Sequence, residues 1–317
     1  MNRKQFKKNC RKSVNALLVY NMLTYVVILF SIVAHVVMAK IRGVNLDLLI
    51  EDDAYWEQLG ESGIEYLIIV FIGFLMIAIF QKWLGSWKEI VRKEKAMDKI
   101  TLFKLCVVFM MPQFLGSIFD YCGESVLNYF GYTMEMSVEA ATSGSESMWM
   151  LLYAGILGPI TEELWFRGVI LKSAMPYGKR FAIVVSSILF GVFHGNIPQG
   201  IFASVIGLVL AYVAVEYSIL WSIALHIFNN LIMCEGTNYL IQNLPISTQD
   251  IICNLLMFLF FLGGIAILWH DRKKIKEYLA QNPKSQKKHY TWYFTMTSTL
   301  IFLLTNLAIS LLGITKL

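Results

Sequence analysis

The sequence contains few charged residues and little proline. Of its 317 residues, 15% are charged and six are proline, whereas 57% are apolar. A soluble globular chain usually carries about 25% charged residues, so this composition argues against a water-soluble enzyme. The five cysteines include no C-x-x-C pair, and they therefore indicate neither a disulfide framework nor a thiolate zinc site. The composition is typical of a polytopic membrane protein.

Long apolar runs alternate with short polar segments along the whole chain. A bilayer core about 30 Å thick requires roughly 20 apolar residues of helix. This criterion predicts an all-α membrane protein with eight to nine transmembrane helices in a single domain, residues 1–317. The nine candidate runs are Val14–Ala39, Ile64–Phe80, Leu102–Asp120, Met148–Leu171, Phe181–His194, Ile201–Val215, Ile219–Cys234, Ile251–Trp269 and Trp292–Ile314.

Basic residues lie between the apolar runs rather than in one patch. The formal net charge of +5 therefore does not indicate a nucleic-acid partner. Six Lys or Arg residues precede the first run, and seven lie between Lys82 and Lys104. Three follow the fourth run, and seven lie between Arg272 and Lys288. By the positive-inside rule these segments face the cytoplasm, which predicts a cytoplasmic N-terminus and a cytoplasmic loop at residues 271–290.

The first run resembles a secretory signal but lacks a small-residue cleavage site, and it is too long for a signal-peptide core. We therefore expect a retained transmembrane helix. The chain as a whole is predicted to reside in a cell membrane, and we expect this to be a bacterial membrane.

Ionisable residues interrupt the fourth apolar run. Two carboxylates, Glu162 and Glu163, are followed by Arg167. Each such group costs about 2.5–3.5 kcal/mol at the bilayer centre on insertion scales, so the three must face the protein interior or a hydrated cavity. Glu163 and Arg167 are four residues apart on one helix face, where an ion pair is expected. Glu162 points about 100° away from Glu163 and is left as the unpaired acid.

Two histidines also lie in predicted membrane helices. His194 ends the fifth run, just before the helix stop signal Gly-Asn-Ile-Pro. His226 and Asn230 share a helix face in the seventh run because they are four residues apart. Together with Glu162 these residues provide a base, a second proton-handling group and neutral hydrogen-bond donors. This is the set needed to hydrolyse an amide by attack of water.

The three segments, in this order and each on an apolar helix, resemble the motifs of the CAAX-protease and bacteriocin-processing family. This family includes the type II CAAX prenyl endopeptidases, which are integral membrane proteins. The matching motifs cover Met148 to Leu231, the expected catalytic core (148–231). They read Glu162-Glu163-Leu-Trp-Phe-Arg167, Phe190-Gly-Val-Phe-His194 and His226-Ile-Phe-Asn-Asn230.

The resemblance implies an intramembrane endopeptidase that needs no metal or other cofactor. Glu162 and His194 would activate a water, while His226 and Asn230 would supply the oxyanion site. The supporting residues would be Glu163, Arg167 and Phe190. The implied substrate is a hydrophobic or membrane-anchored peptide or protein. The depth of Glu162 and His226 in their predicted helices favours an active site open to the cytoplasm, whereas His194 lies closer to the outer end of its run.

Other interpretations of the same residues stay open at this stage. Glu163 and Arg167 could form a structural ion pair between helices, and each histidine alone could be a hydrogen-bonded core residue. Glu162, His194 and His226 could ligate a catalytic zinc. At the level of function, the alternatives are a non-catalytic immunity or scaffold protein and a proton-coupled transporter.

Overall fold

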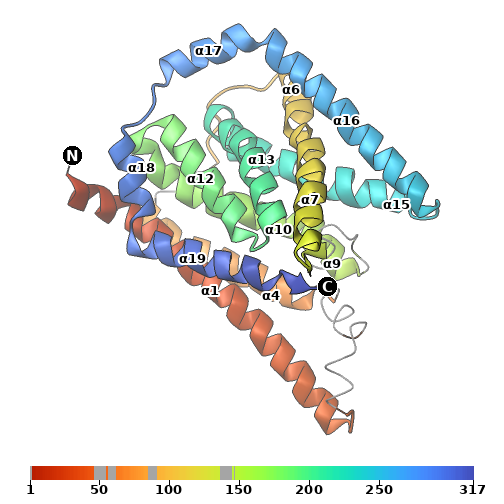
Figure 1. The fold of residues 1–317 in the computed structure, drawn as a ribbon. Helices are drawn as coiled ribbons and strands as arrows, with labels where there is room; N and C mark the ends of the chain where they lie inside the picture. The colour runs from red at the N-terminus through yellow and green to blue at the C-terminus, as the bar shows by residue number, and fades with distance from the viewer. Residues whose placement is uncertain (1, 46–54, 56–61, 85–90, 136–144, 146) are drawn as a thin grey trace.

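A computed structural model describes residues 2–45, 55, 62–84, 91–135, 145 and 147–317, with the side chains of 81–84 excepted. The described chain is helical apart from turns and two short strands (Figure 1). Its longer elements are α1 (Arg3–Ile41), α4 (Ile64–Leu84), α6 (Lys99–Met110), α7 (Pro112–Tyr129), α12 (Lys179–Phe193), α13 (Ile197–Glu216), α16 (Ile246–His270) and α19 (Thr297–Leu312).

Shorter helical elements complete the fold. They are α9 (Met148–Leu152), η1 (Tyr153–Leu157), α10 (Gly158–Glu163), η2 (Leu164–Leu171), α11 (Lys172–Ala174), η3 (Met175–Tyr177), α14 (Ile219–Ile227), η4 (Phe228–Gly236), α15 (Thr237–Ile241), α17 (Arg272–Gln281) and α18 (Lys287–Phe294). Strands β1 (Tyr132–Thr133) and β2 (Thr315–Lys316) pair antiparallel, so the last residues of the chain lie against the end of α7.

Polar side chains fix where several of these helices begin. Asp98 accepts hydrogen bonds from the backbone amides of Ile100 and Thr101 at the start of α6. Asn196 and Ser218 cap α13 and α14 in the same way. Such caps satisfy amides that have no partner within the helix, at a typical gain of about 1 kcal/mol. Apolar runs therefore become helices with defined ends.

Each of the nine predicted runs lies on helix. Five helical stretches of the described chain are long and apolar enough to cross a membrane, or six if the bent pair α18 and α19 forms one span. This supports an all-α polytopic membrane protein. The first stretch is longer than predicted, because α1 begins at Arg3 and includes the basic residues that were expected to precede it. Its 39 residues span roughly 58 Å at about 1.5 Å per residue, more than a bilayer core.

The last predicted span is wrong in one respect, because it is not a single helix. It divides into α18 and α19, which meet at 67°. Lys7 of α1 donates to the carbonyl of Thr295 at this break, at 3.2 Å. The bend allows α18 to pack on the start of α1, where the rings of Phe6 and His289 stack with centroids 5.3 Å apart. Neither glycine nor proline marks the bend in the sequence.

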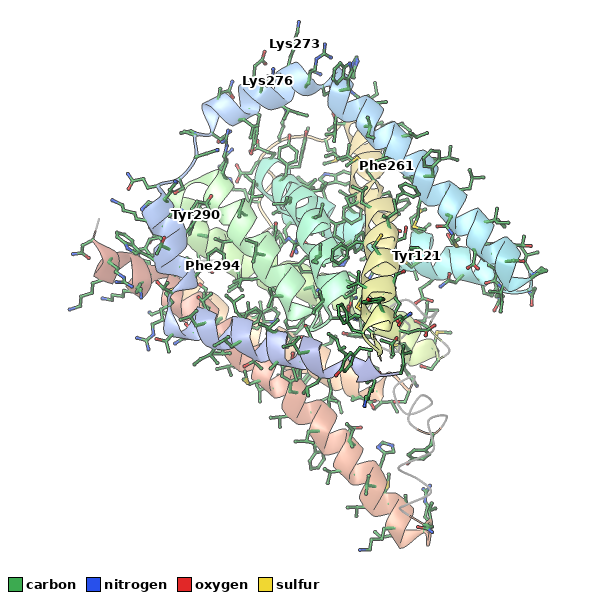
Figure 2. All side chains as sticks on the ribbon, in the orientation of Figure 1. Tyr121, Phe261, Lys273, Lys276, Tyr290 and Phe294 are labelled. Carbon is green, nitrogen blue, oxygen red and sulfur yellow. The ribbon has the colours of Figure 1, made fainter. Side chains whose placement is uncertain are left out.

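The connection at residues 271–290 is also more regular than the expected loop. It contains α17 and the first turn of α18. Figure 2 shows Lys273 and Lys276 pointing away from the body of the molecule, and both are exposed. The segment is therefore largely a polar surface helix rather than an irregular loop.

Helices α12 and α13 lie in the middle of the molecule and pack on each other more extensively than any other pair of described elements (Figure 1). Their close approach depends on Gly191, where a Cβ atom would overlap the carbonyl of Gly200 and the hydroxyl of Ser204. The two helices are joined by a tight turn at Gly195, which has φ +62°. Small residues allow helix backbones to approach in this way in membrane proteins, and the pair forms the scaffold for the candidate site.

Candidate active site

The helix that carries the two adjacent glutamates is interrupted by π-helical turns. Glu162 and Glu163 end the short α-helical segment α10, between the π-helical segments η1 and η2. His226 lies near the end of α14, just before the π-helical segment η4 that carries Asn230. π-helical turns are rare and are often found at functional sites. All three occur in the two helices that face each other at this site.

Glu163 and Arg167 form the expected ion pair, and both side chains are completely buried. Arg167 Nη1 lies 2.9 Å from Glu163 Oε1. Arg167 also donates from Nη2 to the carbonyl of Gly207 on α13, at 3.1 Å, and its guanidinium lies 4.3 Å from the ring centroid of Phe190. Burying an ion costs several kcal/mol unless a partner and further hydrogen bonds offset the loss of water. These contacts supply that compensation.

The carboxylate of Glu163 has two more partners on α14. His226 Nδ1 lies 3.0 Å from Oε1, and the hydroxyl of Ser222 donates to Oε2. Ser222 also contacts the carbonyl of Leu210, 3.0 Å away. A carboxylate accepts and cannot donate, so the Nδ1 of His226 carries the proton of this hydrogen bond. The buried group therefore fixes both the position and the orientation of the imidazole.

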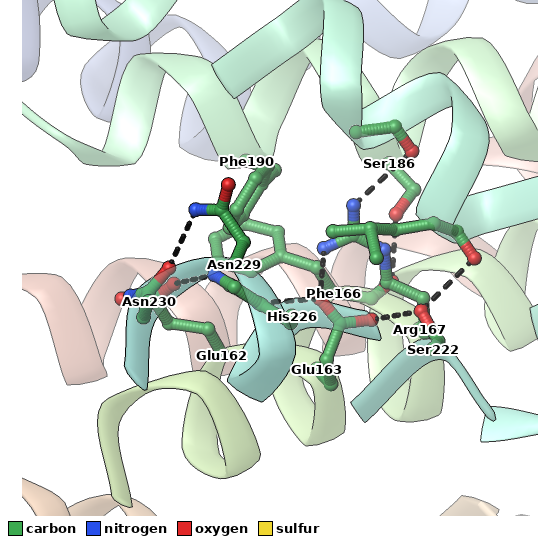
Figure 3. Close-up of polar contacts among 12 residues, drawn as sticks. Glu162, Glu163, Phe166, Arg167, Ser186, Phe190, Ser222, His226, Asn229 and Asn230 are labelled. Atoms are coloured by element: carbon green, nitrogen blue, oxygen red, sulfur yellow. Dashed lines mark hydrogen bonds and ion pairs between the residues drawn. The ribbon is translucent and has the colours of Figure 1, made fainter. Parts of the chain in front are cut away.

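Glu162 lies on the opposite side of the same imidazole. Its Oε2 is 3.8 Å from His226 Nε2, and its side chain keeps 18% exposure, compared with 0% for Glu163. Figure 3 shows Glu162 and Asn230 at one end of the polar cluster, Arg167 with Ser222 at the other, and His226 between them. Of the two adjacent acids, only Glu162 keeps exposed surface.

His194 belongs to the same neighbourhood through Phe190. Its Nδ1 lies 2.8 Å from the carbonyl of Phe190, so this nitrogen is the donor and Nε2 is left to accept. The ring of Phe190 meets the two imidazoles edge-on, with centroids 4.9 Å from His194 and 5.7 Å from His226. His194 also lies near Glu162 and His226.

Aromatic side chains from α1 and α4 complete the surroundings of Glu162. Tyr20 stacks on Trp165 with centroids 5.0 Å apart, and Tyr153 stacks on Tyr66 at 4.7 Å. Tyr20 and Tyr153 both lie near Glu162. Two of these four aromatic side chains, Tyr20 and Tyr66, therefore come from outside the segment that carries the motifs.

Asn230 is held by a chain of amides. Its Nδ2 donates to the carbonyl of Ala154 at 2.9 Å, and its Oδ1 accepts from Asn229 Nδ2 at 2.9 Å. Asn229 in turn accepts from Gln113 Nε2 on α7 at 2.7 Å. Asn229 and Gln113 were not among the sequence-predicted site residues. The sequence shows only that Gln113 follows a proline near the middle of an apolar run, which does not indicate where its side chain will lie.

The side-chain positions give no support to the zinc alternative. In the part of the chain that the structure describes, no three His, Cys, Asp or Glu side chains are grouped closely enough to hold a metal ion.

Comparison with protein families supports the resemblance found in the sequence. Residues 144–232 match the model of a family described as type II CAAX prenyl endopeptidase Rce1-like. The matched segment includes all three motifs, and it confirms the recognition of the CAAX-protease family in this part of the chain. Comparison with curated proteins and with solved structures found no match.

Proposed function

We propose that this membrane protein, related to the type II CAAX prenyl endopeptidases through residues 144–232, is an intramembrane endopeptidase. It would hydrolyse a peptide bond in a hydrophobic or lipid-anchored substrate, with Glu162 as the general base. One observation carries the proposal. A partly exposed carboxylate lies 3.8 Å from an imidazole whose other nitrogen is held by a fully buried carboxylate. A structural ion pair alone would not require the second acid.

The hydrogen bonds of the two histidines support a division of roles. Both rings use Nδ1 to donate, His194 to a backbone carbonyl and His226 to Glu163. The Nε2 of His194 and the carboxylate of Glu162 are then both acceptors. A water molecule has two protons to donate and can satisfy both acceptors at once. This arrangement aligns the water oxygen for attack and weakens its O–H bonds.

In the proposed reaction, the water oxygen attacks the substrate carbonyl carbon while Glu162 accepts a proton. The new oxyanion is stabilised by Asn230 and by His226, which acts in its protonated form with Glu163 as the counter-charge. The carbon–nitrogen bond then breaks, and Glu162 returns its proton to the leaving amine. The products are a carboxylic acid and an amine, and transfer of the acid's proton to the amine gives a carboxylate and an ammonium group. Donors aimed at an oxyanion typically contribute about 10²–10³-fold each in rate.

The test compares membranes from cells that express the wild type with membranes that express Glu162→Gln. The substitution keeps the shape of the side chain but removes its basicity. Peptide fragments that depend on wild-type protein should disappear, because loss of a general base costs about 10²–10⁴-fold. Asp250→Asn on the exposed start of α16 is the matched control and should release fragments normally. Unchanged fragment release by Glu162→Gln would refute the proposed base.

A pair of quenched peptides addresses the substrate class. Both share one hydrophobic sequence, and one carries a farnesyl thioether on a cysteine near its C-terminus. Cleavage of the farnesylated peptide alone would assign prenylated substrates, whereas cleavage of both would assign hydrophobic peptides in general.

If Glu162→Gln leaves the cellular phenotype of the wild type intact, a non-catalytic binding or immunity protein is the better description.

The proposal includes nine spans with a cytoplasmic N-terminus and an active site that opens to the cytoplasm. The exposed lysines of α17 support this orientation, since basic surface segments remain on the cytoplasmic side. The proposal also keeps residues 1–317 as one membrane domain with its catalytic core at 148–231. Cysteine labelling at position 273 and at position 316 from each side of the membrane tests it. We expect opposite labelling for the two positions.

A further inference from the structure

A chain of three hydrogen-bonded amides crosses from α7 to the candidate site. Gln113 lies in the first turn of α7, directly after Pro112 and outside residues 144–232. Its Nε2 is 2.7 Å from Asn229 Oδ1, Asn229 Nδ2 is 2.9 Å from Asn230 Oδ1, and Asn230 Nδ2 is 2.9 Å from the carbonyl of Ala154. Asn229 is buried, with 6% exposure. The chain thus joins three separate elements, α7, η4 and η1.

The direction of the chain is fixed at one end by a backbone group. The carbonyl of Ala154 can only accept, so Asn230 must present its NH₂ group there. The oxygen of Asn230 then faces Asn229, which must donate. The oxygen of Asn229 is left to face Gln113, which must donate in turn. Reversal of any one amide would place two oxygens or two NH₂ groups in contact.

We propose that Gln113 and Asn229 are positioning residues that hold the Asn230 carboxamide in one orientation for catalysis. An amide NH₂ group has two protons, and the carbonyl of Ala154 uses one of them. The second N–H of Asn230 is the donor available to the substrate oxyanion. A carboxamide that flips would present its oxygen there and repel the developing charge. The inference rests on the proposed function, and it assigns part of the site to α7.

The alternative is that the three amides only join helices. Hydrogen bonds between membrane helices contribute about 0.6 kcal/mol on average, and this is a contribution to stability, whichever group of Asn230 faces the substrate. A purely structural role therefore depends on the presence of a hydrogen bond, whereas a positioning role depends on its direction. Variants that reverse the direction at constant shape distinguish the two roles.

Asn229→Asp is such a variant. A protonated carboxyl has one O–H donor and one carbonyl acceptor, so it can donate to Asn230 and accept from Gln113 as the wild type does. An ionised carboxyl can only accept, and it would turn the Asn230 amide around. Peptide cleavage by the variant, divided by cleavage by the wild type at the same pH, should therefore fall as the pH rises. Dividing by the wild type removes the pH dependence that the two proteins share.

The measurement uses isolated membranes incubated at pH values from about 5 to about 8, with the wild-type-dependent fragments quantified. We expect the activity ratio to drop by about 100-fold across the range, the typical effect of losing one oxyanion donor. Gln113→Glu should show the same pH dependence, and it keeps the proposal testable if Asn229→Asp fails to insert. Asn238→Asp on α15 is the matched control, because the same change there should give a flat ratio.

The outcomes separate this inference from the proposed function. Flat activity ratios for both Asn229→Asp and Gln113→Glu, with unchanged thermal stability, would overturn the positioning role. Wild-type-dependent fragments that still require Glu162 would in that case leave the endopeptidase proposal standing. Fragments that persist in Glu162→Gln would overturn the endopeptidase proposal, and the positioning role with it.

Discussion

Removal of Arg167 alone should destabilise the protein much more than removal of the whole ion pair. In Arg167→Met the carboxylate of Glu163 stays completely buried and loses the guanidinium 2.9 Å away. Breaking a buried pair by removing one partner costs about 3–5 kcal/mol, whereas replacing both partners by neutral groups of similar volume is often nearly neutral. In the double variant Glu163→Gln/Arg167→Met, the introduced amide oxygen can still accept from Ser222. We therefore expect the second substitution to recover most of the loss.

The comparison is a double-mutant cycle on the purified protein in detergent micelles. Thermal unfolding is measured for the wild type, the two single variants and the double variant. A loss of about 3–5 kcal/mol in Arg167→Met corresponds to a fall in Tm of roughly 5–15 °C for a chain of this size. The coupling between the two positions should be about 3 kcal/mol, well above the error of additivity for independent sites.

Activity should not follow stability in this cycle. The double variant recovers its fold but lacks the carboxylate that holds His226 Nδ1 at 3.0 Å, so we expect it to release no wild-type-dependent fragments. If the double variant is as unstable as Arg167→Met, the buried charge is not the source of the loss. If Arg167→Met is as stable as the wild type, the carboxylate of Glu163 is not confined as described. Cleavage by a stable double variant would refute the orienting role of Glu163.

Two further predictions concern packing and pH. Gly191→Ala should lower stability by about 1–3 kcal/mol or more, because the added methyl group would overlap the backbone carbonyl of Gly200. Gly116→Ala, which meets a neighbour only at ordinary contact distance, is its control, and equal Tm values for the two variants would contradict the packing argument. The hydrogen bond from Lys104 is the largest cause that lowers the pKa of Asp271 below its ordinary range. Stability from this pair is therefore present above about pH 3.9 and is lost as the pH falls through the lowered pKa. When the pH is lowered from about 5 to about 3, the wild type should therefore lose more stability than Lys104→Met. Parallel Tm curves for the two proteins would show that the pair contributes nothing.

Local sequence spacing was sufficient to predict the features that depend on a single helix. The ion pair of Glu163 and Arg167 follows from a separation of four residues. The end of α12 at Phe193, with His194 as its C-cap, follows from the Gly-Asn-Ile-Pro stop signal. The apolar runs likewise predicted an all-α membrane protein, whereas the number of nine spans stays a prediction. The catalytic roles of Glu162, His194, His226 and Asn230 stay predictions.

Features that depend on how helices meet could not be predicted in this way. Ser222 contacts Glu163 across 59 residues of sequence, and Gln113 contacts Asn229 across 116. Both are common polar residues in apolar runs, with no spacing that connects them to the motifs. The bend between α18 and α19 was also missed, since it arises from packing on α1 and not from glycine or proline. Tertiary packing decides these features, and a single sequence records it only indirectly.

The π-helical turns beside Glu163 and His226 make the number of residues in these helices as important as their identity. A π turn pairs residues five apart instead of four, so it holds one residue more than an α turn. Deletion of a single residue from Leu164–Leu171 would let that stretch relax to ordinary helical pairing and would remove the widened turn beside Glu163. The π turn takes up the extra residue within itself, so Lys172 and the chain beyond it would keep nearly their present orientation. Such a deletion should therefore change the geometry of the site while the rest of the helix stays in register.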